Sequence, residues 1–538
     1  MLQSSSVFTK LSRLGAKLYY LDESENHSSP GMKTDEYRHE FAAYNSALEL
    51  ALYQHRAGFE PELHTEPIYE RYAGLFTREA IDGLQKERDQ VPAHRETERD
   101  ALHALVGAAR IGYLEARAKE LADECARCES SASVEWDGES VPAHNVTQKI
   151  ANERDASRRR ELTARWLDAL AACDDLRVAR FESFHESARS LGFDSYRALF
   201  TDITGTDYEA LAASTDAFLA RTEAPYRSAL ARAVGQDLPD IPFDELQHAD
   251  FFFFERMPRL DPFFPAQDLL ETYRSAMSGL GIQIDQQKNI HIDHEVRPFK
   301  NPRAACFRIN PPDDVRLLLA PIGGAYDYAV LFHEAGHAQH FAWTSRDLVK
   351  QYPEFVYAPD FATTEGYAFL LNHLFQDAVW LAEHRPGINE RQAREIARDR
   401  MLLTMHQVRR FCAKLKYEVA LHDSPRVRSE HLADTYATLQ TEATLFRRSP
   451  ALYLKDVDNG FYVAAYLRAW AFEAGLTEHL RTRYGRRWWA SGKARDDLID
   501  LWNTSSRYTV EELARLIGFG EISFDLLADS LVAGVCED

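Results

Sequence analysis

The sequence predicts a mostly α-helical protein with one small antiparallel β-sheet. Two observations support this prediction. Apolar residues recur every three or four positions over long stretches, which places them on one face of a helix. A single region near residues 285–321 instead alternates apolar and polar residues, as a half-buried strand does. No internal repeat of fixed period is present.

Helical periodicity covers segments on both sides of that region. In Glu161–Gly192 the apolar stripe ends at a glycine, a frequent helix terminator. The same periodicity extends over Glu36–Gln54, Tyr208–Val234, Arg391–Leu421 and Asp497–Leu516. Two looser segments interrupt the helices: Ser130–Asn145, expected to be a loop, and Gly235–Pro265, where Phe251–Phe254 predict a buried strand or helix.

The sheet is predicted from three short stretches. IQIDQQKNIHIDHEV alternates apolar and polar residues, and the runs Cys306–Asn310 and Val315–Pro321 flank the turn sequence PPDD. The sheet ends at Pro321, and Gly323 and Gly324 let the backbone turn into the next helix. A chain of 538 residues exceeds the size of a single core. We therefore expect an N-terminal helical lobe, residues 1–284, and a second lobe, residues 285–538, that contains the sheet.

The charge of the chain limits its partners. The net charge of -21, from 84 acidic and 63 basic residues, argues against nucleic acids and anionic membranes as partners. No run of 18 apolar residues predicts a membrane span. Residues 1–20 contain Lys10, Arg13 and Lys17 but no acid, like a transit peptide. We favour a first helix or a flexible extension over residues 1–30 rather than organellar targeting.

The six cysteines are scattered and too few for a disulfide framework, as in proteins made in a reducing compartment. This predicts a cytoplasmic protein. Cys125 and Cys128 have the spacing of a redox or zinc pair, but no second pair completes four ligands. We interpret them as two thiols on a helix surface.

The segment LFHEAGHAQHF, Leu331–Phe341, contains a zinc-binding motif. On a helix, His333 and His337 lie four residues apart on one face, so that both imidazoles reach one ion. Glu334 is rotated by about 100° from His333, where it can take a proton from a water on the metal. This is the H-E-x-x-H arrangement. Small residues, Ala335 and Gly336, allow a neighbouring element to approach closely.

The third ligand is expected from another helix. His340 lies seven residues beyond His333, about 10.5 Å along the axis, too far to share one zinc ion, and we expect it to pack or to support the ligands. DFATTEGYAFLLNHLF, Asp360–Phe375, places Glu365 at the start of an apolar helix. Two histidines and a glutamate are a known catalytic zinc set, so Glu365 is the candidate. One Zn²⁺ is predicted.

These motifs, together with DVDNGFYVAAYLRAW, Asp456–Trp470, resemble the thimet oligopeptidase, neurolysin and oligoendopeptidase F family. The resemblance covers roughly residues 285 to 480. It implies a bilobed helical body with a deep central channel, one zinc ion at its floor, and cleavage of short unfolded peptides. It also implies that the substrate lies along an edge strand within Cys306–Pro321 and that Gly323 and Gly324 permit close approach of the peptide backbone.

The C-terminal segment only partly follows the family pattern. In the family, a histidine and tyrosines of this segment stabilise the oxyanion. Tyr462 and Tyr466 are the candidate tyrosines in this chain. An acid near Asp456 or Asp458 stands where the histidine is expected. Arg468 falls near a family tyrosine. It could bind a peptide's terminal carboxylate, which would favour carboxypeptidase-like trimming, or form a structural ion pair.

Three functions fit the sequence. The leading hypothesis is a zinc metallopeptidase in which Glu334 is the general base for hydrolysis of short peptides. The second is a catalytically idle peptide-binding or scaffold protein that keeps a zinc site. The third is another zinc hydrolase, such as a deacylase. Side-chain preference, the choice between endopeptidase and carboxypeptidase action, and oligomeric state do not follow from the sequence.

Overall fold

The computed structural model describes residues 32–301, 303–358 and 360–536. Helices dominate it, as the periodicity predicts. The helices before the zinc motif are α1 (Thr34–Arg56), α2 (Glu66–Arg71), α3 (Arg78–Gln90), α4 (Glu96–Arg117), α5 (Lys119–Ser131), α6 (Ala143–Asn152), α7 (Ala156–Ala171), α8 (Asp174–Ser190), α9 (Tyr196–Thr204), α10 (Tyr208–Asp237), α11 (His248–Arg256) and α12 (Leu269–Leu280). The transit-peptide-like residues 1–20 lie outside the described residues.

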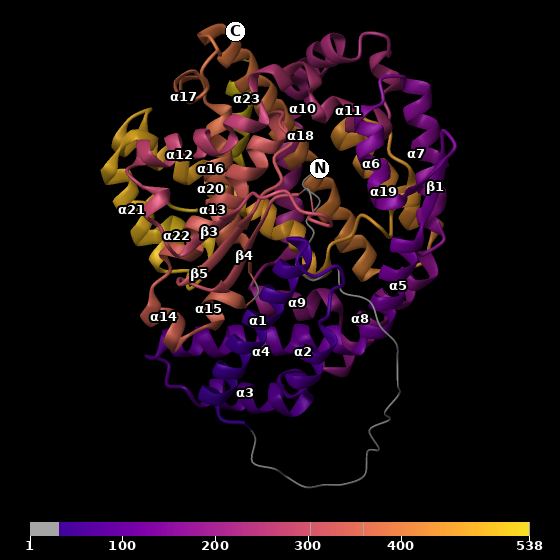
Figure 1. Ribbon diagram of the computed structural model, residues 1–538. Coiled ribbons are helices and arrows are strands. Elements are labelled where there is room, and N and C mark those ends of the chain that lie inside the picture. Colours follow the sequence, from indigo (N-terminus) through magenta and orange to yellow (C-terminus); the bar gives the residue numbers. More distant parts are fainter. Residues whose placement is uncertain (1–31, 302, 359, 537–538) are drawn as a thin grey trace.

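The second half of the chain is equally helical, with short 3₁₀ turns between several elements. Its helices are α13 (Ala325–Trp343), α14 (Arg346–Gln351), α15 (Glu354–Tyr357), α16 (Ala362–Asn372), α17 (Ala378–His384), α18 (Glu390–Asp423), α19 (Glu430–Thr444), α20 (Tyr462–Tyr484), α21 (Gly492–Asn503), α22 (Val510–Leu516) and α23 (Phe524–Cys536). Figure 1 shows α1 to α4 grouped at one end, with the sheet above them among the helices of the second half.

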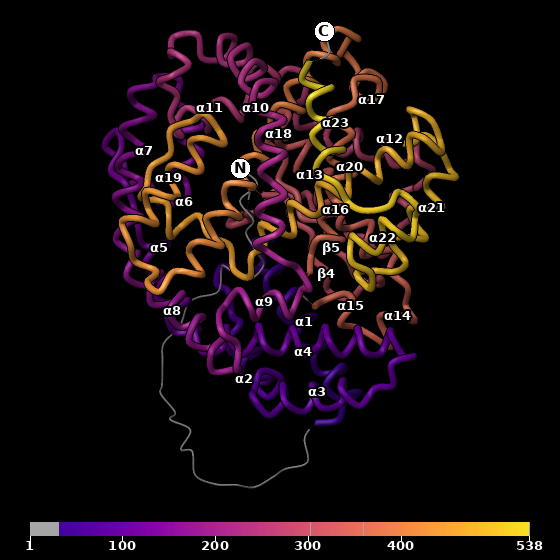
Figure 2. Tube along the Cα trace, turned by 180° about the vertical axis from the view of Figure 1, so that it is seen from behind, coloured from indigo at the N-terminus to yellow at the C-terminus, as the bar shows by residue number. Residues whose placement is uncertain are grey.

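The order of elements in space does not follow the order in the chain. Helix α19 lies beside α6 and α7, helices of the first half, in both Figure 1 and Figure 2. A bridge between Gln247 and Arg447 joins the same regions. The main apolar core is likewise shared: it contains Leu162 and Phe251 from the first half together with Leu331, Val408 and other residues of the second half. The predicted boundary at residues 284/285 therefore crosses one continuous core.

The predicted sheet is present, but one of its pairings differs from the prediction. Its strands are β3 (Ile290–Asp293), β4 (Ala305–Asn310) and β5 (Asp314–Leu318), in the order β3-β5-β4. β4 and β5 are antiparallel around the PPDD turn, as expected, whereas β3 runs parallel to β5. The prediction of an all-antiparallel sheet is wrong for β3 because alternation reports a buried face and carries no information about strand direction.

Ser130–Asn145 is not a plain loop. It contains a hairpin of β1 (Ser133–Trp136) and β2 (Glu139–Pro142), and both residues of its turn, Asp137 and Gly138, have positive φ. Asp-Gly favours such tight hairpin turns. The four-phenylalanine run forms part of the buried helix α11, in agreement with the prediction of a buried element.

The prediction of two surface thiols is wrong. Cys125 is buried, and Cys128 forms a disulfide with Cys173 at a Cα–Cα distance of 5.9 Å. These cysteines are 45 residues apart. The pairing could not be predicted from spacing, because it depends on how α5 packs against α8.

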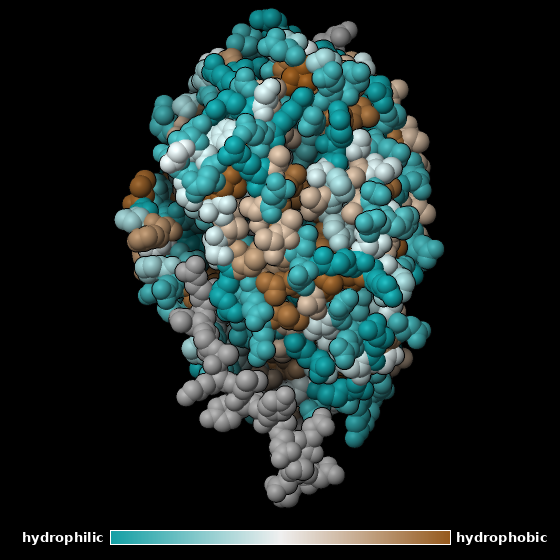
Figure 3. Space-filling model, turned by 90° about the vertical axis from the view of Figure 1, so that its right-hand side faces the viewer, coloured by the Kyte–Doolittle hydropathy of each residue, from teal (hydrophilic) through white to brown (hydrophobic). Residues whose placement is uncertain are grey.

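One face of the molecule carries mostly hydrophilic residues. Figure 3 shows one face with mostly hydrophilic residues and smaller, separated apolar areas, consistent with the net charge of -21. Within the described ranges, no helix is long and apolar enough to cross a membrane.

Candidate metal centre

Helices α13 and α16 are in direct backbone contact at the predicted metal site. A Cβ atom added to Gly336 would lie 2.5 Å from Ala368 Cα and 2.7 Å from Tyr367 O. Only glycine fits at this distance, which confirms the close approach expected from the small residues of the motif. The contact brings Glu365, on the first turn of α16, opposite His333 and His337 on α13.

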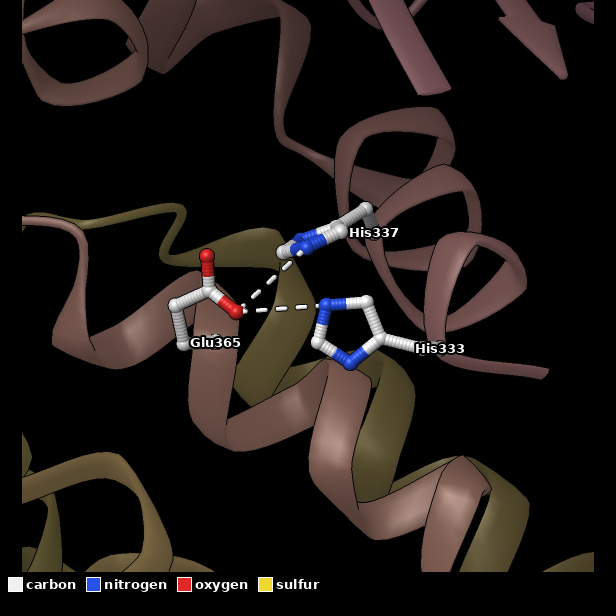
Figure 4. A group of neighbouring side chains, drawn as sticks. All are labelled: His333, His337 and Glu365. Carbon is white, nitrogen blue, oxygen red and sulfur yellow. Dashed lines mark ion pairs between the residues drawn. The ribbon is translucent and has the colours of Figure 1, made fainter. Parts of the chain in front are cut away.

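The three predicted ligands converge (Figure 4). Glu365 Oε2 lies 3.3 Å from His333 Nε2 and 3.7 Å from His337 Nε2. Tetrahedral zinc with bonds of about 2.0 Å separates its ligand atoms by roughly 3.3 Å, so these distances fit one ion. Glu365 Oε2 is buried without a hydrogen-bond partner among the described residues. The donor set and the orphaned oxygen together suit a divalent metal.

The electrostatics of the group favour a cation. Burial raises the pKa of Glu365, but the nearby imidazoles and the hydrogen bond from Tyr462 outweigh burial and leave the pKa below its usual value. The carboxyl is therefore ionised. Burial lowers the pKa of His337 to about 4, so this imidazole is neutral near pH 7 and offers a lone pair to a metal.

Thr364 orients one of the ligands. Its Oγ1 lies 2.8 Å from His337 Nδ1. With the ring hydrogen on Nδ1, His337 donates to Thr364 and turns the lone pair of Nε2 toward Glu365. Such outer partners fix the tautomer of a metal-binding histidine. The sequence alone does not predict this contact, because it depends on how α16 packs on α13.

Glu334 lies outside the ligand group, beside strand β4. Its Oε2 accepts a hydrogen bond of 2.8 Å from the backbone N–H of Cys306. Burial raises the pKa of this carboxyl, while His333 and the Cys306 N–H act in the opposite direction. A carboxyl adjacent to the ligands, held by one oxygen, with a raised pKa, is suited to accept and return a proton.

Tyr462 and Tyr466 both face the metal group from α20. The hydroxyl of Tyr462 donates to Glu365 Oε1 at 2.7 Å. The hydroxyl of Tyr466 has no hydrogen bond in the described part of the chain, and its ring packs against Phe369 and Tyr462. Burial raises the pKa of Tyr466, and the charges of Glu365 and Asp458 add to this effect. Of the two tyrosines, only Tyr462 has its hydroxyl bonded to another described residue.

Arg468 forms ion pairs with two carboxylates of the protein. Its guanidinium donates to Glu511 at 2.7 Å and to Asp360 at 2.9 and 3.1 Å. Only 5% of the residue is exposed. Of the two interpretations of Arg468, the arrangement matches the structural ion pair, since four of its five N–H donors are engaged by carboxylates.

Gly323 and Gly324 form the turn between the sheet and α13, with φ of 88° and 93°. Their N–H groups are used internally: Gly323 donates to Asp327 Oδ2 at 3.0 Å and Gly324 to Phe264 O at 2.8 Å. Neither N–H is therefore open to a peptide in this conformation.

The acids at the position of the family histidine belong to a buried ionic cluster. Asp456 accepts two hydrogen bonds from Arg410, at 2.6 and 2.7 Å, and Lys414 lies 2.9 Å from Asp458. These basic partners lower the pKa of Asp456 against the effect of burial. His340 is fully buried on Tyr367 and outside the ligand group.

Solved structures share this fold. A structure assigned as an oligoendopeptidase F from Bacillus anthracis matches with a TM-score of 0.65 and 14% identity, over 92% of this chain and 89% of that one. The chain has an oligoendopeptidase F fold. PZ peptidase A, solved with an inhibitor, matches with a TM-score of 0.63 and 15% identity, over 93% and 91% of the two chains. No protein-family model and no curated protein sequence matches.

Proposed function

We propose that this protein is a zinc-dependent oligopeptidase that hydrolyses short peptides. The observation that carries the proposal is the position of Glu334, adjacent to the ligand group of His333, His337 and Glu365 but not part of it. A purely structural metal site has no use for such a carboxylate, whereas hydrolysis requires a base at this position.

The proposed chemistry divides among the residues of the site. Zinc, when bound, supplies Lewis acidity toward water and the substrate carbonyl. Glu334 takes a proton from the attacking water and returns it to the leaving amine. Its Oε2 is held by Cys306, so the carboxylate keeps its orientation while the proton moves. The hydroxyl of Tyr466 donates a hydrogen bond to the oxyanion, and that of Tyr462 holds Glu365 in place.

The position of β4 supports a peptide as the substrate. β4 is an edge strand in the order β3-β5-β4, and its Cys306 N–H points to Glu334 rather than to β5. An extended peptide can add to such an edge. A peptide bound there would pass directly beside the proposed base. The fold shared with PZ peptidase A and the oligoendopeptidase F structure agrees with this proposal.

The test compares the wild type with Glu334→Gln at equal zinc content, on unstructured peptides of various lengths. We expect cleavage by the wild type, and a loss of about 10³-fold or more in kcat for the variant. A chelator should abolish activity and added zinc should restore it. Zinc-loaded wild type that binds peptides without cutting them would instead identify an idle peptide-binding protein.

A further inference from the structure

A second polar site lies on the same helix as the metal ligands. A cavity of about 40 Å³ opens beside α13, lined by Tyr326, Val330, Phe369, Arg400, Gln407 and Trp470 among others. Phe369 connects it to the metal group, since its ring centroid lies 5.3 Å from that of His333 and 4.5 Å from that of Trp470. The apolar walls are therefore continuous with the proposed active site.

Arg400 is the basic residue of this cavity. Its Nε is buried and has no hydrogen-bond partner, and no ion pair within the described part of the chain includes its guanidinium. Arg410, ten residues later on α18, by contrast donates through Nη2 to both carboxylate oxygens of Asp456. Burial lowers the pKa of Arg400, and the charge of Glu255 across the cavity offsets this only in part. The guanidinium is thus desolvated without a carboxylate in contact.

The other polar side chains of the cavity are already occupied. Gln407 donates to Glu255 Oε1 at 2.8 Å, and Asn372 donates to the carbonyl of Ala329 at 2.7 Å. Open donors at a half-buried arginine match the two oxygens of a carboxylate, which a guanidinium binds through paired hydrogen bonds.

The distance between the cavity and the metal group indicates how many residues separate such a carboxylate from the cleaved bond of a peptide. The α13 residues that line the cavity, from Tyr326 to Val330, precede His333 by seven to three residues, which is about 10.5 to 4.5 Å along the axis. An extended peptide advances roughly 3.3 Å per residue. The cavity thus lies about one to three residues from the scissile bond, with Tyr326 at its far end.

We propose that Arg400 binds a carboxylate of the substrate, two or three residues beyond the cleaved bond. This rests on the proposed peptidase function and extends it to specificity. With the α-carboxylate as ligand, the enzyme releases short C-terminal fragments; with an aspartate or glutamate side chain as ligand, it cuts internally before an acidic residue. Arg400, rather than Arg468, would then be the arginine that binds a carboxylate of the peptide.

The experiment measures kcat/KM for matched decapeptides with a free C-terminus or a C-terminal amide, with products mapped by mass spectrometry. A second pair exchanges glutamate for glutamine at the third position after the cut. We expect the wild type to favour one carboxylate-bearing peptide at least tenfold. Dependence on the C-terminus identifies the α-carboxylate and dependence on glutamate identifies the side chain. Equal rates for all four peptides would overturn the proposal.

The variant Arg400→Gln should bring the preference ratio close to one, while Arg394→Gln, at an exposed position on the same helix, keeps the wild-type ratio. A preference that survives in a folded, zinc-loaded Arg400→Gln protein would also contradict the assignment. The wild-type ratio tests the proposal even where the variant does not fold. Binding of the same peptides to zinc-loaded Glu334→Gln, followed by fluorescence anisotropy, separates failure of this site from failure of catalysis.

Discussion

Gly336 on α13 touches Ala368 on α16: a Cβ atom at Gly336 would lie 2.5 Å from the Ala368 Cα. This contact lies between His333 and His337 on one helix and just beyond Glu365 on the other. The spacing between the two helices, and therefore the distance between the three ligand atoms, depends on the missing side chain of Gly336.

Gly336→Ala should weaken both the fold and the metal site. The added methyl meets backbone atoms of Tyr367 and Ala368, which cannot rotate away, and overpacking of this kind costs about 1 to 3 kcal/mol. Thermal unfolding and a zinc competition titration measure the two effects. Gly83→Ala is the control, because nothing lies within 4 Å of its added Cβ on α3. Unchanged zinc affinity in Gly336→Ala would show that α16 adjusts freely.

Thr364→Val should lower zinc affinity about 10- to 100-fold, because His337 loses the acceptor that holds its tautomer. The substitution preserves the shape of the side chain. A chelator competition measures the affinity, and Thr364→Ser, which keeps the hydroxyl, should retain most of it. Equal zinc affinities for the valine and serine variants would show that the Thr364 hydroxyl does not support zinc binding.

Tyr466→Phe should reduce kcat about 100-fold with little change in KM or zinc content, since the lost hydroxyl is expected to act only on the oxyanion. Tyr462→Phe should differ from it by also weakening zinc binding, because its hydroxyl holds Glu365. Steady-state kinetics and metal analysis of both variants distinguish these roles. A rise in KM alone for Tyr466→Phe would assign this residue to substrate binding.

Arg468→Met should destabilise the protein by about 3 kcal/mol, because Asp360 and Glu511 lose their shared partner. Denaturant unfolding measures this loss. We expect the preference between free and amidated C-termini to stay at the wild-type value. A variant of unchanged stability that loses this preference would restore Arg468 as a ligand of the terminal carboxylate.

The buried pair of His185 and His422 should make the fold sensitive to acid. Their rings meet at 2.9 Å between Nε2 and Nδ1. Burial, reinforced by Arg189 and opposed by Asp423, lowers the pKa of His185 from 6.5 to about 4; burial and His185 lower the pKa of His422 as well. Between pH 6.5 and pH 4 the unfolded chain binds more protons than the folded one. The free energy of unfolding therefore falls as the pH falls.

The contribution of His185 alone amounts to about 3 kcal/mol between pH 6.5 and pH 4. Denaturant unfolding over this range measures it. His185→Gln should flatten the pH dependence, whereas a substitution of the exposed His39 should leave it unchanged. The same slope in wild type and His185→Gln would exclude the pair as its source.

Much of the fold could be predicted from local patterns. The apolar stripes of α10 and α18 and the PPDD turn between β4 and β5 depend on neighbours in sequence, and these elements were predicted correctly. The parallel pairing of β3 and the Cys128–Cys173 disulfide were not, because each joins segments whose meeting depends on the packing of intervening helices. The β1–β2 hairpin does have a local signal, because Asp137-Gly138 is a dipeptide that favours tight hairpin turns.

Local sequence patterns are enough to predict the side chains of the metal site: two histidines one helical turn apart, a glutamate beside them, and a second glutamate at the start of an apolar helix. Helical periodicity is enough to place these groups on their own elements. The pairing of the arginines, in contrast, depends on how the helices pack. Packing surrounds Arg468 with two carboxylates, whereas Arg400 lines a cavity and forms no ion pair with the described residues. The availability of a charged group depends on its neighbours in space, and those are set by the packing of helices far apart in the chain.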